Sequence, residues 1–411
     1  MYNTAPADGE RDPVMPATAG DFAISIRSVE APRHRFSEMK VRRSSVLSLI
    51  APFAPPLTGQ TAYSAHLRGV LEPHGFETMA VPGRDARDGL RGYVRKAVAS
   101  FGVLRRLLFG APRETVVLVL DGGVGLVLDL LYVLCARVRG TRAIALSHHS
   151  FAYVTRRSFW LWSLLRVAPR DTTIHLFLCE QMRAQFVLRY GPVRSRVLSN
   201  AAAVVTTPVP AARDGVFRLG YLSNITFEKG IEAYFDLVEA LVARGVDVRG
   251  CIAGPAGSDA VATFLAQRIA CSGGRVSWLG PLYGAEKDRF LSSISVLVFP
   301  TDYVNEAQPI VLFEALAHGV PVVTIGRGCI RGDMEGSGSL VAGSASMFLE
   351  EAVPFVQSLA ERYRRGETGT VASLATARYL QARVASQAAE AALIAELSAS
   401  AARERGRRSM A

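Results

Sequence analysis

The sequence has few cysteines and no segment that resembles a secretion signal. Its five cysteines are scattered over 411 residues and form no Cys-x-x-Cys motif. This excludes a zinc ribbon and a disulfide-rich scaffold, and it fits a reducing cytosol. The first twenty residues are polar and contain three prolines, so no cleavable signal is expected. Charged residues make up 20% and apolar residues 49% of the chain, which excludes wholesale disorder and a coiled coil.

Long apolar runs are also scarce, and only Val116 to Val138 raises the question of a membrane span. As a span, this window would place Asp121 and Asp129 in hydrocarbon and a Gly-Gly pair at its middle, each of which is unfavourable. As a buried strand followed by a glycine turn and an apolar helix, it carries no such cost. The second interpretation is therefore favoured.

Positive charge is present in excess, but only in one half of the chain. The sequence has 47 basic and 36 acidic side chains, a formal net charge of +11. Residues 1–200 contain 27 basic and 15 acidic side chains, whereas residues 201–411 contain 20 and 21. This asymmetry indicates that the first half meets an anionic partner.

Short apolar runs alternate with longer helical segments, which predicts parallel sheets covered by helices. The length suggests two to three domains. Residues 1–43 are expected to form a tail, with one strand at Phe22–Ile26. The other predicted units are a first α/β domain over residues 44–205, a second over residues 206–372 after a proline-containing linker, and a region with a long helix over residues 373–411. Ligands bind beyond the carboxyl ends of strands in such sheets, which predicts a cleft between the two domains.

Two carboxylates are spaced unusually in VFPTDYVNEAQPIVLFEALAHGVPVVT, residues 298–324. A buried strand leads to Glu306, and a helix is expected to begin near Pro309 and to end at Gly319. Glu314 interrupts the apolar face of this helix. Each acid alone would be read as a residue near a helix cap or as a solvated side chain. Together they indicate a site where a helix N-terminus binds an anion and a carboxylate accepts hydrogen bonds from a polyol such as ribose.

This segment resembles the Glu-x7-Glu signature of family 4 glycosyltransferases. The family's other segments are matched in order by GYLSNITFEKGIE (220–232), GCIAGP (250–255) and VSWLGPL (276–282), and in the first half by PPLTGQTAYSAHL (55–67), HHS (148–150) and RVLSNAAAV (196–204). The likeness covers residues 44–400 and is strongest from 217 to 326.

The resemblance implies the GT-B fold, an α/β architecture in which two Rossmann-like, doubly wound domains face a cleft and a C-terminal helix crosses back to the first domain. It also implies an enzyme, a hexosyltransferase that moves a sugar from a UDP- or GDP-sugar to a glycan or lipid-linked acceptor with retention of configuration. Exopolysaccharide and lipopolysaccharide synthesis are typical settings of such enzymes.

The resemblance implies catalytic roles for four residues. Lys229 would neutralise the donor diphosphate, whose charge grows as it departs. Glu306 would lie near the donor sugar, and either His148 or His149 would contact that sugar. The simpler alternatives are a surface lysine at a helix start and a core or surface histidine.

Donor-binding residues follow from the same resemblance. Glu314 would hold the ribose hydroxyls, and the backbone amides of Ala307 and Gln308 would reach the sugar or phosphate. Gly59 would let the backbone approach the donor, because a Cβ there would obstruct it. Asn224 and Arg327 complete the set of donor-binding candidates.

The sequence departs from the family pattern in two places. Tyr221 stands where the family often has an arginine that provides a second phosphate cation, so Arg327, Arg331 or helix dipoles would have to serve instead. The common form E-G-F-G appears here as E-A-Q-P, in which Pro309 lacks the amide proton of the usual residue.

No Asp-x-Asp motif and no cluster of residues with metal-ligand spacing occurs in the sequence. A metal-dependent GT-A enzyme would normally use such a motif to hold its divalent ion on the diphosphate. Metal-independent transfer without a cofactor is therefore expected.

Basic and aromatic residues gather in two segments of the first half. Residues 84–113 place Arg95, Arg105 and Arg106 around apolar residues at helical spacing, namely Val94, Val98, Phe101, Leu104 and Leu108. Residues 151–170 place Arg156 near Trp160. Such segments are typical of proteins that lie on an anionic bilayer.

This pattern predicts a cytoplasmic protein that is peripheral on the inner face of the membrane, where a lipid-linked acceptor would be found. Two alternatives remain: ordinary core helices with solvated arginines, and a nucleic-acid surface. No nucleic-acid motif supports the second of these.

Two other functions are compatible with the motifs. One is a nucleotide-sugar 2-epimerase of the same fold, which would release a modified sugar without an acceptor. The other is a non-catalytic protein that binds nucleotide-sugars. Slow donor hydrolysis that is abolished by Lys229→Ala would argue against the second.

Overall fold

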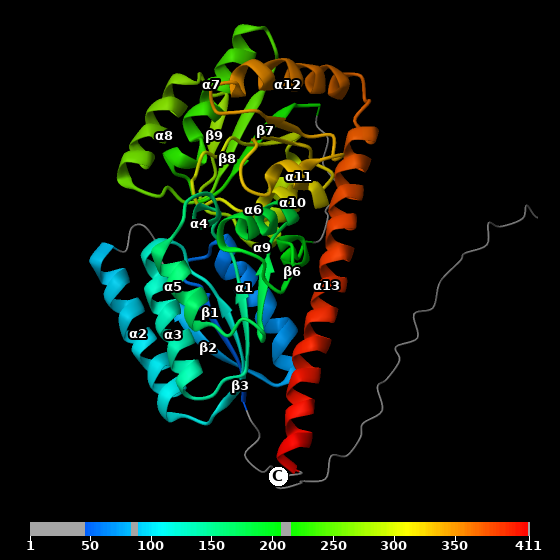
Figure 1. Ribbon diagram of the computed structural model, residues 1–411. Coiled ribbons are helices and arrows are strands. Elements are labelled where there is room, and N and C mark those ends of the chain that lie inside the picture. Colours follow the sequence, from blue (N-terminus) through cyan, green and yellow to red (C-terminus); the bar gives the residue numbers. More distant parts are fainter. Residues whose placement is uncertain (1–45, 84–88, 207–214, 410–411) are drawn as a thin grey trace, which may run out of the picture. The chain divides into compact units, whose positions relative to one another are not determined.

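The computed structural model describes residues 46–83, 89–206 and 215–409 (Figure 1). The expected N-terminal tail, including the strand predicted at Phe22–Ile26, lies outside the described residues, as does most of the linker.

The first sheet contains six parallel strands in the order β2-β1-β3-β4-β5-β6. The strands are β1 (Val46–Phe53), β2 (Phe76–Pro82), β3 (Arg113–Val119), β4 (Ala143–Ser147), β5 (Thr173–Phe177) and β6 (Ser195–Val197). The helices between them are α1 (Gly59–Leu71), α2 (Gly89–Phe109), α3 (Leu126–Val138), α4 (Ala152–Thr155), α5 (Phe159–Val167) and α6 (Glu180–Tyr190).

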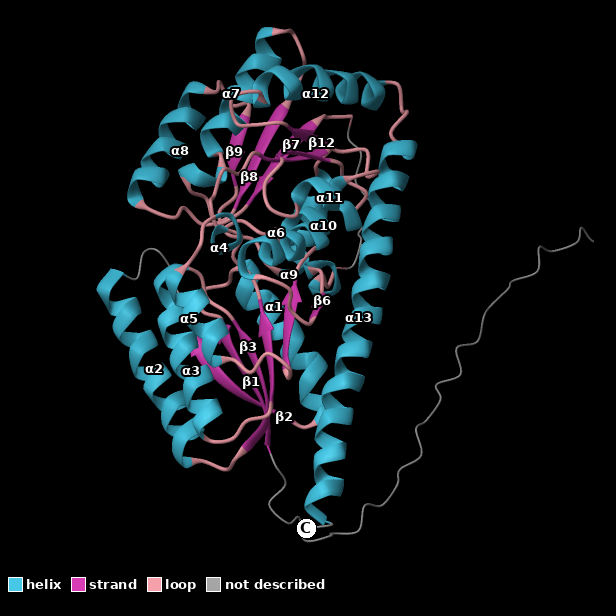
Figure 2. Ribbon diagram, in the orientation of Figure 1, coloured by secondary structure: helices cyan, strands magenta, loops and turns pink. Residues whose placement is uncertain are grey.

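The second sheet also contains six parallel strands, in the order β12-β11-β10-β7-β8-β9. Figure 2 shows β7, β8 and β9 of this sheet with helices around them. The strands are β7 (Arg218–Leu222), β8 (Arg249–Ala253), β9 (Val276–Trp278), β10 (Val296–Phe299), β11 (Val322–Ile325) and β12 (Leu340–Ala342). The helices are α7 (Ile231–Ala243), α8 (Asp259–Cys271), α9 (Gly284–Ser293), α10 (Ile310–Ala317), α11 (Ile330–Met334), α12 (Phe348–Arg364) and α13 (Gly369–Ser409).

The two doubly wound α/β sheets predicted from the sequence are confirmed, and two edge strands, β2 and β12, were missed. β2 alternates buried and exposed residues at the edge of its sheet, and β12 is only three residues long. Both lack the continuous apolar run that identifies a central strand of a parallel sheet.

The apolar window from Val116 to Val138 is a strand, a glycine turn and a helix. Every residue of β3 is buried, and α3 packs its apolar side chains into the same core. In the part of the chain that the structure describes, no helix is long and apolar enough to cross a membrane.

The long helix α13 contacts both halves, as predicted. Ala375 and Tyr379 pack in the core that also contains α10, whereas Leu393 and Leu397 pack against strands of the first sheet. His66 of α1 lies 2.7 Å from Glu390, which adds a polar contact at this end. The helix thus joins the two halves along its length (Figure 1).

The strand order fixes where a ligand would enter the second half. The chain runs from β7 outward through β8 and β9, then returns to place β10 on the other side of β7. In doubly wound sheets a ligand binds in the crevice at such a switch point, beyond the carboxyl ends of the two strands on either side of it. Lys229 follows β7 and Glu306 follows β10.

Candidate functional site

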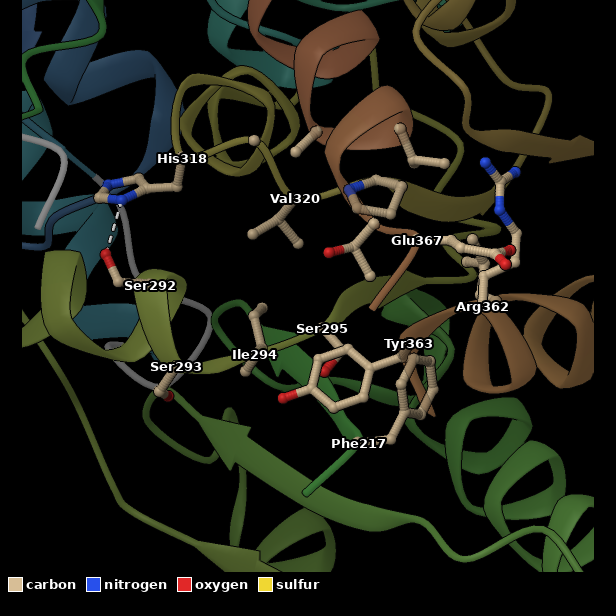
Figure 3. A pocket seen from close by; sticks show the side chains of 16 residues that line it. Phe217, Ser292, Ser293, Ile294, Ser295, His318, Val320, Arg362, Tyr363 and Glu367 are labelled. Carbon is tan, nitrogen blue, oxygen red and sulfur yellow. Dashed lines mark hydrogen bonds between the residues drawn. The ribbon is translucent and has the colours of Figure 1, made fainter. Parts of the chain in front are cut away.

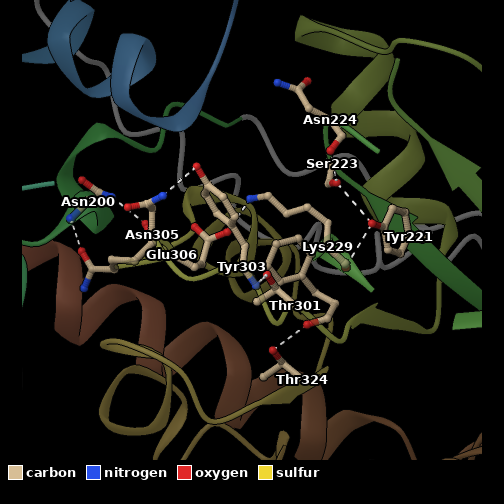
Figure 4. A network of polar contacts seen from close by, with 12 residues as sticks. Asn200, Tyr221, Ser223, Asn224, Lys229, Thr301, Tyr303, Asn305, Glu306 and Thr324 are labelled. Atoms are coloured by element: carbon tan, nitrogen blue, oxygen red, sulfur yellow. Dashed lines mark hydrogen bonds and ion pairs between the residues drawn. The ribbon is translucent and has the colours of Figure 1, made fainter. Parts of the chain in front are cut away.

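Lys229 and Glu306 meet directly at the switch point of the second sheet. The Lys229 ammonium donates a hydrogen bond to Oε2 of Glu306, and the two side chains are 22% and 11% exposed. The same ammonium lies 5.4 Å from the ring centre of Phe299 and 5.2 Å from that of Tyr303. Two residues that are 77 positions apart in sequence therefore form one partly desolvated charge pair (Figure 4).

Tyr221, which stands at the position of the family's arginine, holds the backbone of Lys229. Its hydroxyl donates to the carbonyl of Lys229 at 3.1 Å and accepts from Ser223 Oγ at 3.3 Å (Figure 4). Burial raises the pKa of Tyr221 well above its ordinary value, so it stays neutral. It positions the lysine but provides no second cation.

Gly230 turns the chain sharply between Lys229 and α7. Its φ is +80°, and a Cβ at this position would lie 2.1 Å from the carbonyl oxygen of Pro300. Only glycine fits this close approach of the β7 and β10 loops. The glycine thereby brings Lys229 to the loop that contains Glu306.

Glu314 is buried within α10 and paired with Lys287 of α9 at 2.5 Å. Its interpretation as a solvated helix residue is therefore wrong. The Glu314 side chain is 11% exposed and that of Lys287 is 25% exposed, so the pair can be reached from solvent at its lysine side. A ligand with hydroxyl groups could exchange with Lys287 at this carboxylate.

The start of α10 carries backbone donors near this pair. Pro309 is the N-cap residue, one position before the first helical residue, and it has no N–H group. Among the described residues, no acceptor is found for the backbone N–H groups of Ala307 and Gln308. Both residues are nearly buried, at 3% and 4% exposed, and their assignment to the donor site stays a prediction.

The side chain of Gln308 lies between the two halves of the chain. Its Oε1 accepts from the backbone N–H of Asn200 at 2.6 Å, and its Nε2 donates to the carbonyl of Leu178 at 3.2 Å. Nε2 also donates to the Asp333 carboxylate at 2.9 Å, and burial raises the pKa of Asp333 to about 7. Because it is only 4% exposed, the side chain of Gln308 connects the halves and does not face a ligand.

A second polar contact between the halves lies beside Glu306. Ser150 Oγ, after β4, donates to Asn305 Oδ1 at 2.9 Å, and Asn305 Nδ2 donates to the Tyr303 hydroxyl at 3.2 Å. The loop before Glu306 is therefore held by the strand end that carries His148 and His149.

The two candidate histidines differ in their surroundings. His148 has no exposed surface, and its ring nitrogens lie 3.2 Å from the Tyr153 hydroxyl and 3.0 Å from a nitrogen of His175. His149 is partly exposed, with Nε2 3.0 Å from Ser147 Oγ and its ring 4.4 Å from that of Tyr63. Burial lowers the pKa of His149 to about 3, so its ring is neutral near pH 7. Of the two, His149 is the one that a ligand can reach.

Three predicted donor residues line the edges of this region. Asn224 is exposed and donates to the carbonyl of Leu57 at 3.3 Å, which links the loop after β7 to the loop before α1. A Cβ at Gly59 would meet no protein atom within 4 Å, so the chain itself does not require glycine there. Arg327 forms an ion pair with Asp302.

A disulfide bond joins Cys179 to Cys329, with Cα atoms 5.8 Å apart. Cys179 precedes α6 and Cys329 precedes α11, so the bond connects the two halves. The exclusion of a disulfide-rich scaffold is compatible with this single bond, but the sequence did not indicate the pair. The two cysteines are 150 residues apart, so no local sequence motif identifies them as a pair.

A pocket in the second half lies at the opposite end of the sheet. It is lined by residues that precede β7, β10 and β11, together with residues of α12. Inside it, Ser292 Oγ lies 3.0 Å from Nδ1 of His318 (Figure 3). None of the predicted site residues lines this pocket.

The outer surface of the first half exposes apolar side chains beside arginines. On α2, three residues at helical spacing, Val94, Val98 and Phe101, are 55%, 68% and 69% exposed, whereas Val103 and Leu107 face the core. The alternative of an ordinary core helix therefore does not hold for Val94, Val98 and Phe101. Arg105 and Arg106 are exposed on the same helix, and Arg95 donates to the carbonyl of Gly83.

Helix α5, which like α2 packs against α3, also exposes aromatic residues. Phe159 and Trp160 are 65% and 40% exposed, and the preceding Arg156 is also exposed. We call the exposed residues of α2 and α5 named above the apolar–basic face.

Within residues 46–83, 89–206 and 215–409, no group of three or more His, Cys, Asp or Glu side chains could hold a metal ion.

Several residues of the site could not be identified from sequence. The site contains three residues whose side-chain hydrogen bonds reach partners 25 to 155 positions away in the sequence, namely Lys287, Asn305 and Asp333. Lys287 occurs in an ordinary charged helix, GAEKDRFLSS, and only its contact with Glu314 distinguishes it.

Comparisons with known proteins agree with this architecture. Residues 216–357 match the family model described as glycosyl transferases group 1. No curated protein sequence matches the chain significantly.

Solved structures match most of the chain at low identity. Anabaena Alr3699/HepE in complex with UDP has 16% identity and a TM-score of 0.61, covering 85% of this chain and 99% of that one. A trehalose-6-phosphate protein from E. coli, bound with UDP-2-fluoro glucose, has 12% identity and a TM-score of 0.59, covering 86% and 99%. Sucrose-phosphate synthase from Thermosynechococcus elongatus has 14% identity and a TM-score of 0.56, covering 82% and 97%. The chain therefore has the GT-B fold that its sequence predicts.

Proposed function

We propose that this protein transfers a glycosyl group from a nucleotide-diphosphate sugar, a UDP- or GDP-sugar, to a hydroxyl of a glycan or lipid-linked acceptor, with retention of configuration. The observation that carries the proposal is the pair of Lys–Glu contacts, Lys229–Glu306 and Lys287–Glu314, on segments that follow β7, β9 and β10. These segments belong to the region that matches the glycosyl transferases group 1 model. Structural relatives in complex with UDP and UDP-glucose support the donor class.

Lys229 is the group best placed to stabilise the leaving diphosphate. In the absence of a ligand its charge is balanced by Glu306. A bound diphosphate would compete for the ammonium, and the attraction grows as the bond between the anomeric carbon and the phosphate oxygen breaks. The acceptor oxygen forms the new bond to that carbon, and its proton leaves with the diphosphate.

The remaining groups would orient the donor. Glu314 would accept hydrogen bonds from the ribose hydroxyls, which would take the place of its contact with Lys287. The N–H groups of Ala307 and Gln308 would donate to the sugar or phosphate, next to the positive end of α10. His149 would contact the sugar from the first half as a neutral ring.

Turnover is expected to be independent of divalent metal, because a lysine and a helix terminus provide the positive charge at the diphosphate. The measurement is release of nucleoside diphosphate from UDP-, GDP- and ADP-sugars, with and without EDTA. Equal rates are the expected result. Complete loss in EDTA that manganese restores would contradict metal-independent transfer.

The apolar–basic face is proposed to lie on an anionic membrane, where a lipid-linked acceptor would be presented. Its exposed valines and aromatic rings would enter the interface while its arginines contact lipid phosphates. Each basic residue near such a surface contributes about 1 kcal/mol, so reversing two arginines weakens binding by roughly 100-fold or more.

The double variant Arg105→Glu/Arg106→Glu is therefore expected to lose flotation with vesicles that contain anionic phospholipid. The matched control is Arg364→Glu/Arg365→Glu, which makes the same change of charge on exposed residues of the second half. Undiminished flotation of the first variant, or equal loss in both variants, would contradict the proposed membrane face.

A further inference from the structure

The Cys179–Cys329 bond lies where the two halves meet and next to the candidate donor site. Cys179 is the N-cap residue of α6, directly after β5 and Leu178, and it is partly exposed. Cys329 is 1% exposed and begins the turn into α11. Cys179 is therefore the more accessible residue of the two.

Both ends of this bond contact the segment that follows Glu306. The backbone N–H of Cys329 donates to the carbonyl of Ala307 at 2.8 Å. On the other side, Gln308 Nε2 donates to the carbonyl of Leu178, the residue before Cys179. The predicted donor-binding residues Ala307 and Gln308 are thus held between the two cysteines.

The packing at this point leaves little room for independent movement. A Cβ at Gly328 would lie 2.5 Å from the carbonyl oxygen of Ala307 and 2.6 Å from that of Glu306. A shift of Cys329 therefore moves the backbone that carries Glu306.

We propose that Cys179 and Cys329 form a reversible thiol–disulfide site that controls access to the donor site, with the oxidised form closed and slow and the reduced form active. This inference rests on the proposed function. Hydrogen bonds from Ser150 to Asn305 and from Asn224 to Leu57 join the two halves beside Lys229 and Glu306, so a nucleotide that enters between the halves must separate these groups. Hydrogen bonds such as those of Gln308 can break and reform during this movement, but a covalent bond cannot.

The difference in exposure between the two cysteines determines which sulfur a reductant attacks first. A thiolate of a dithiol reductant attacks Sγ of Cys179, the more accessible residue, and the Cys329 sulfur leaves as a thiolate that takes up a proton. The second thiolate of the reductant then displaces Cys179, and the reductant departs as its own disulfide. The N-terminus of α6 stabilises the departing Cys179 thiolate. A small disulfide oxidant reverses both steps and leaves as two thiols.

The other three cysteines provide a reference for counting the free thiols of the oxidised and reduced protein. Cys135, Cys251 and Cys271 are free, and burial raises the pKa of the first two thiols. After denaturation, the oxidised protein should therefore bind three equivalents of a maleimide and the reduced protein five.

The experiment compares the full-length protein after treatment with oxidised glutathione or with dithiothreitol. We expect a change from three to five maleimide adducts by mass spectrometry and a lower Tm after reduction, because the bond closes a loop of 150 residues. Release of nucleoside diphosphate from UDP-glucose and GDP-mannose should rise on the order of ten-fold upon reduction, within the range of known couplings between sites.

Cysteine variants separate the bond from general effects of the reagents. Cys179→Ser and Cys329→Ser should each turn over at the reduced rate under both treatments, whereas Cys271→Ser should respond like the wild type. Five adducts in the oxidised sample, or equal turnover in both states, would overturn the proposal. Three adducts, a redox-dependent Tm and no turnover of any donor would instead contradict the proposed function.

Discussion

Replacement of Lys229 with methionine is expected to lower kcat/KM for the nucleotide-sugar by about 10²- to 10³-fold, the usual effect of removing one group that stabilises developing charge. The ammonium is the cation that meets Glu306, and Tyr221 provides no second one. The loss should appear in kcat, because the charge on the leaving diphosphate is greatest in the transition state.

The variant also leaves Glu306, which is 11% exposed, without its partner. This is expected to destabilise the fold by about 1–3 kcal/mol. The double variant Lys229→Met/Glu306→Gln removes the unpaired charge and should regain the stability but not the activity. A single variant with normal kcat, or a double variant with restored kcat, would contradict the assigned role of Lys229.

Replacement of Gly230 with alanine is expected to destabilise the second half by about 2–5 kcal/mol. The positive φ contributes about 1–2 kcal/mol, and the overlap with the Pro300 carbonyl adds about 1–3 kcal/mol. The matched control is Gly75→Ala, whose φ is +84° but whose Cβ would meet no atom within 4 Å.

The measurement is the Tm of each variant in the same redox state. Gly230→Ala should show a clearly larger decrease than Gly75→Ala, because only the first suffers the overlap. Equal decreases would mean that the loops after β7 and β10 do not approach as closely as described.

The sequence predicted the parts of the site that depend on local pattern. Glu306, Glu314 and Lys229 each stand at a fixed distance from a buried strand, so their place at the carboxyl edge of the sheet follows from the strands alone. The central strands were predicted for the same reason, since strands buried on both faces are continuous apolar runs.

The parts that were missed depend on contacts between distant residues. Nothing in the segment around Lys287 distinguishes it before α9 and α10 are packed together. The sequence assigned the backbone amide of Gln308 to the donor site, but it did not indicate that the side chain bridges Asn200 and Asp333. The Cys179–Cys329 disulfide could not be predicted from the sequence either, because the two cysteines lie in different halves of the chain.

The central claim is that the crevice between β7 and β10 binds a nucleotide-diphosphate sugar, and a thermal-shift screen of UDP-, GDP- and ADP-sugars tests it most directly. A ligand that binds only the folded state raises the free energy of unfolding, by about 2.7 kcal/mol at a ligand concentration of 100 times its Kd. The Tm rises as a result. We predict that donors of one base raise the Tm of the wild type and fail to raise that of Lys229→Met/Glu306→Gln. No shift with any donor, or an equal shift in both proteins, would contradict the claim.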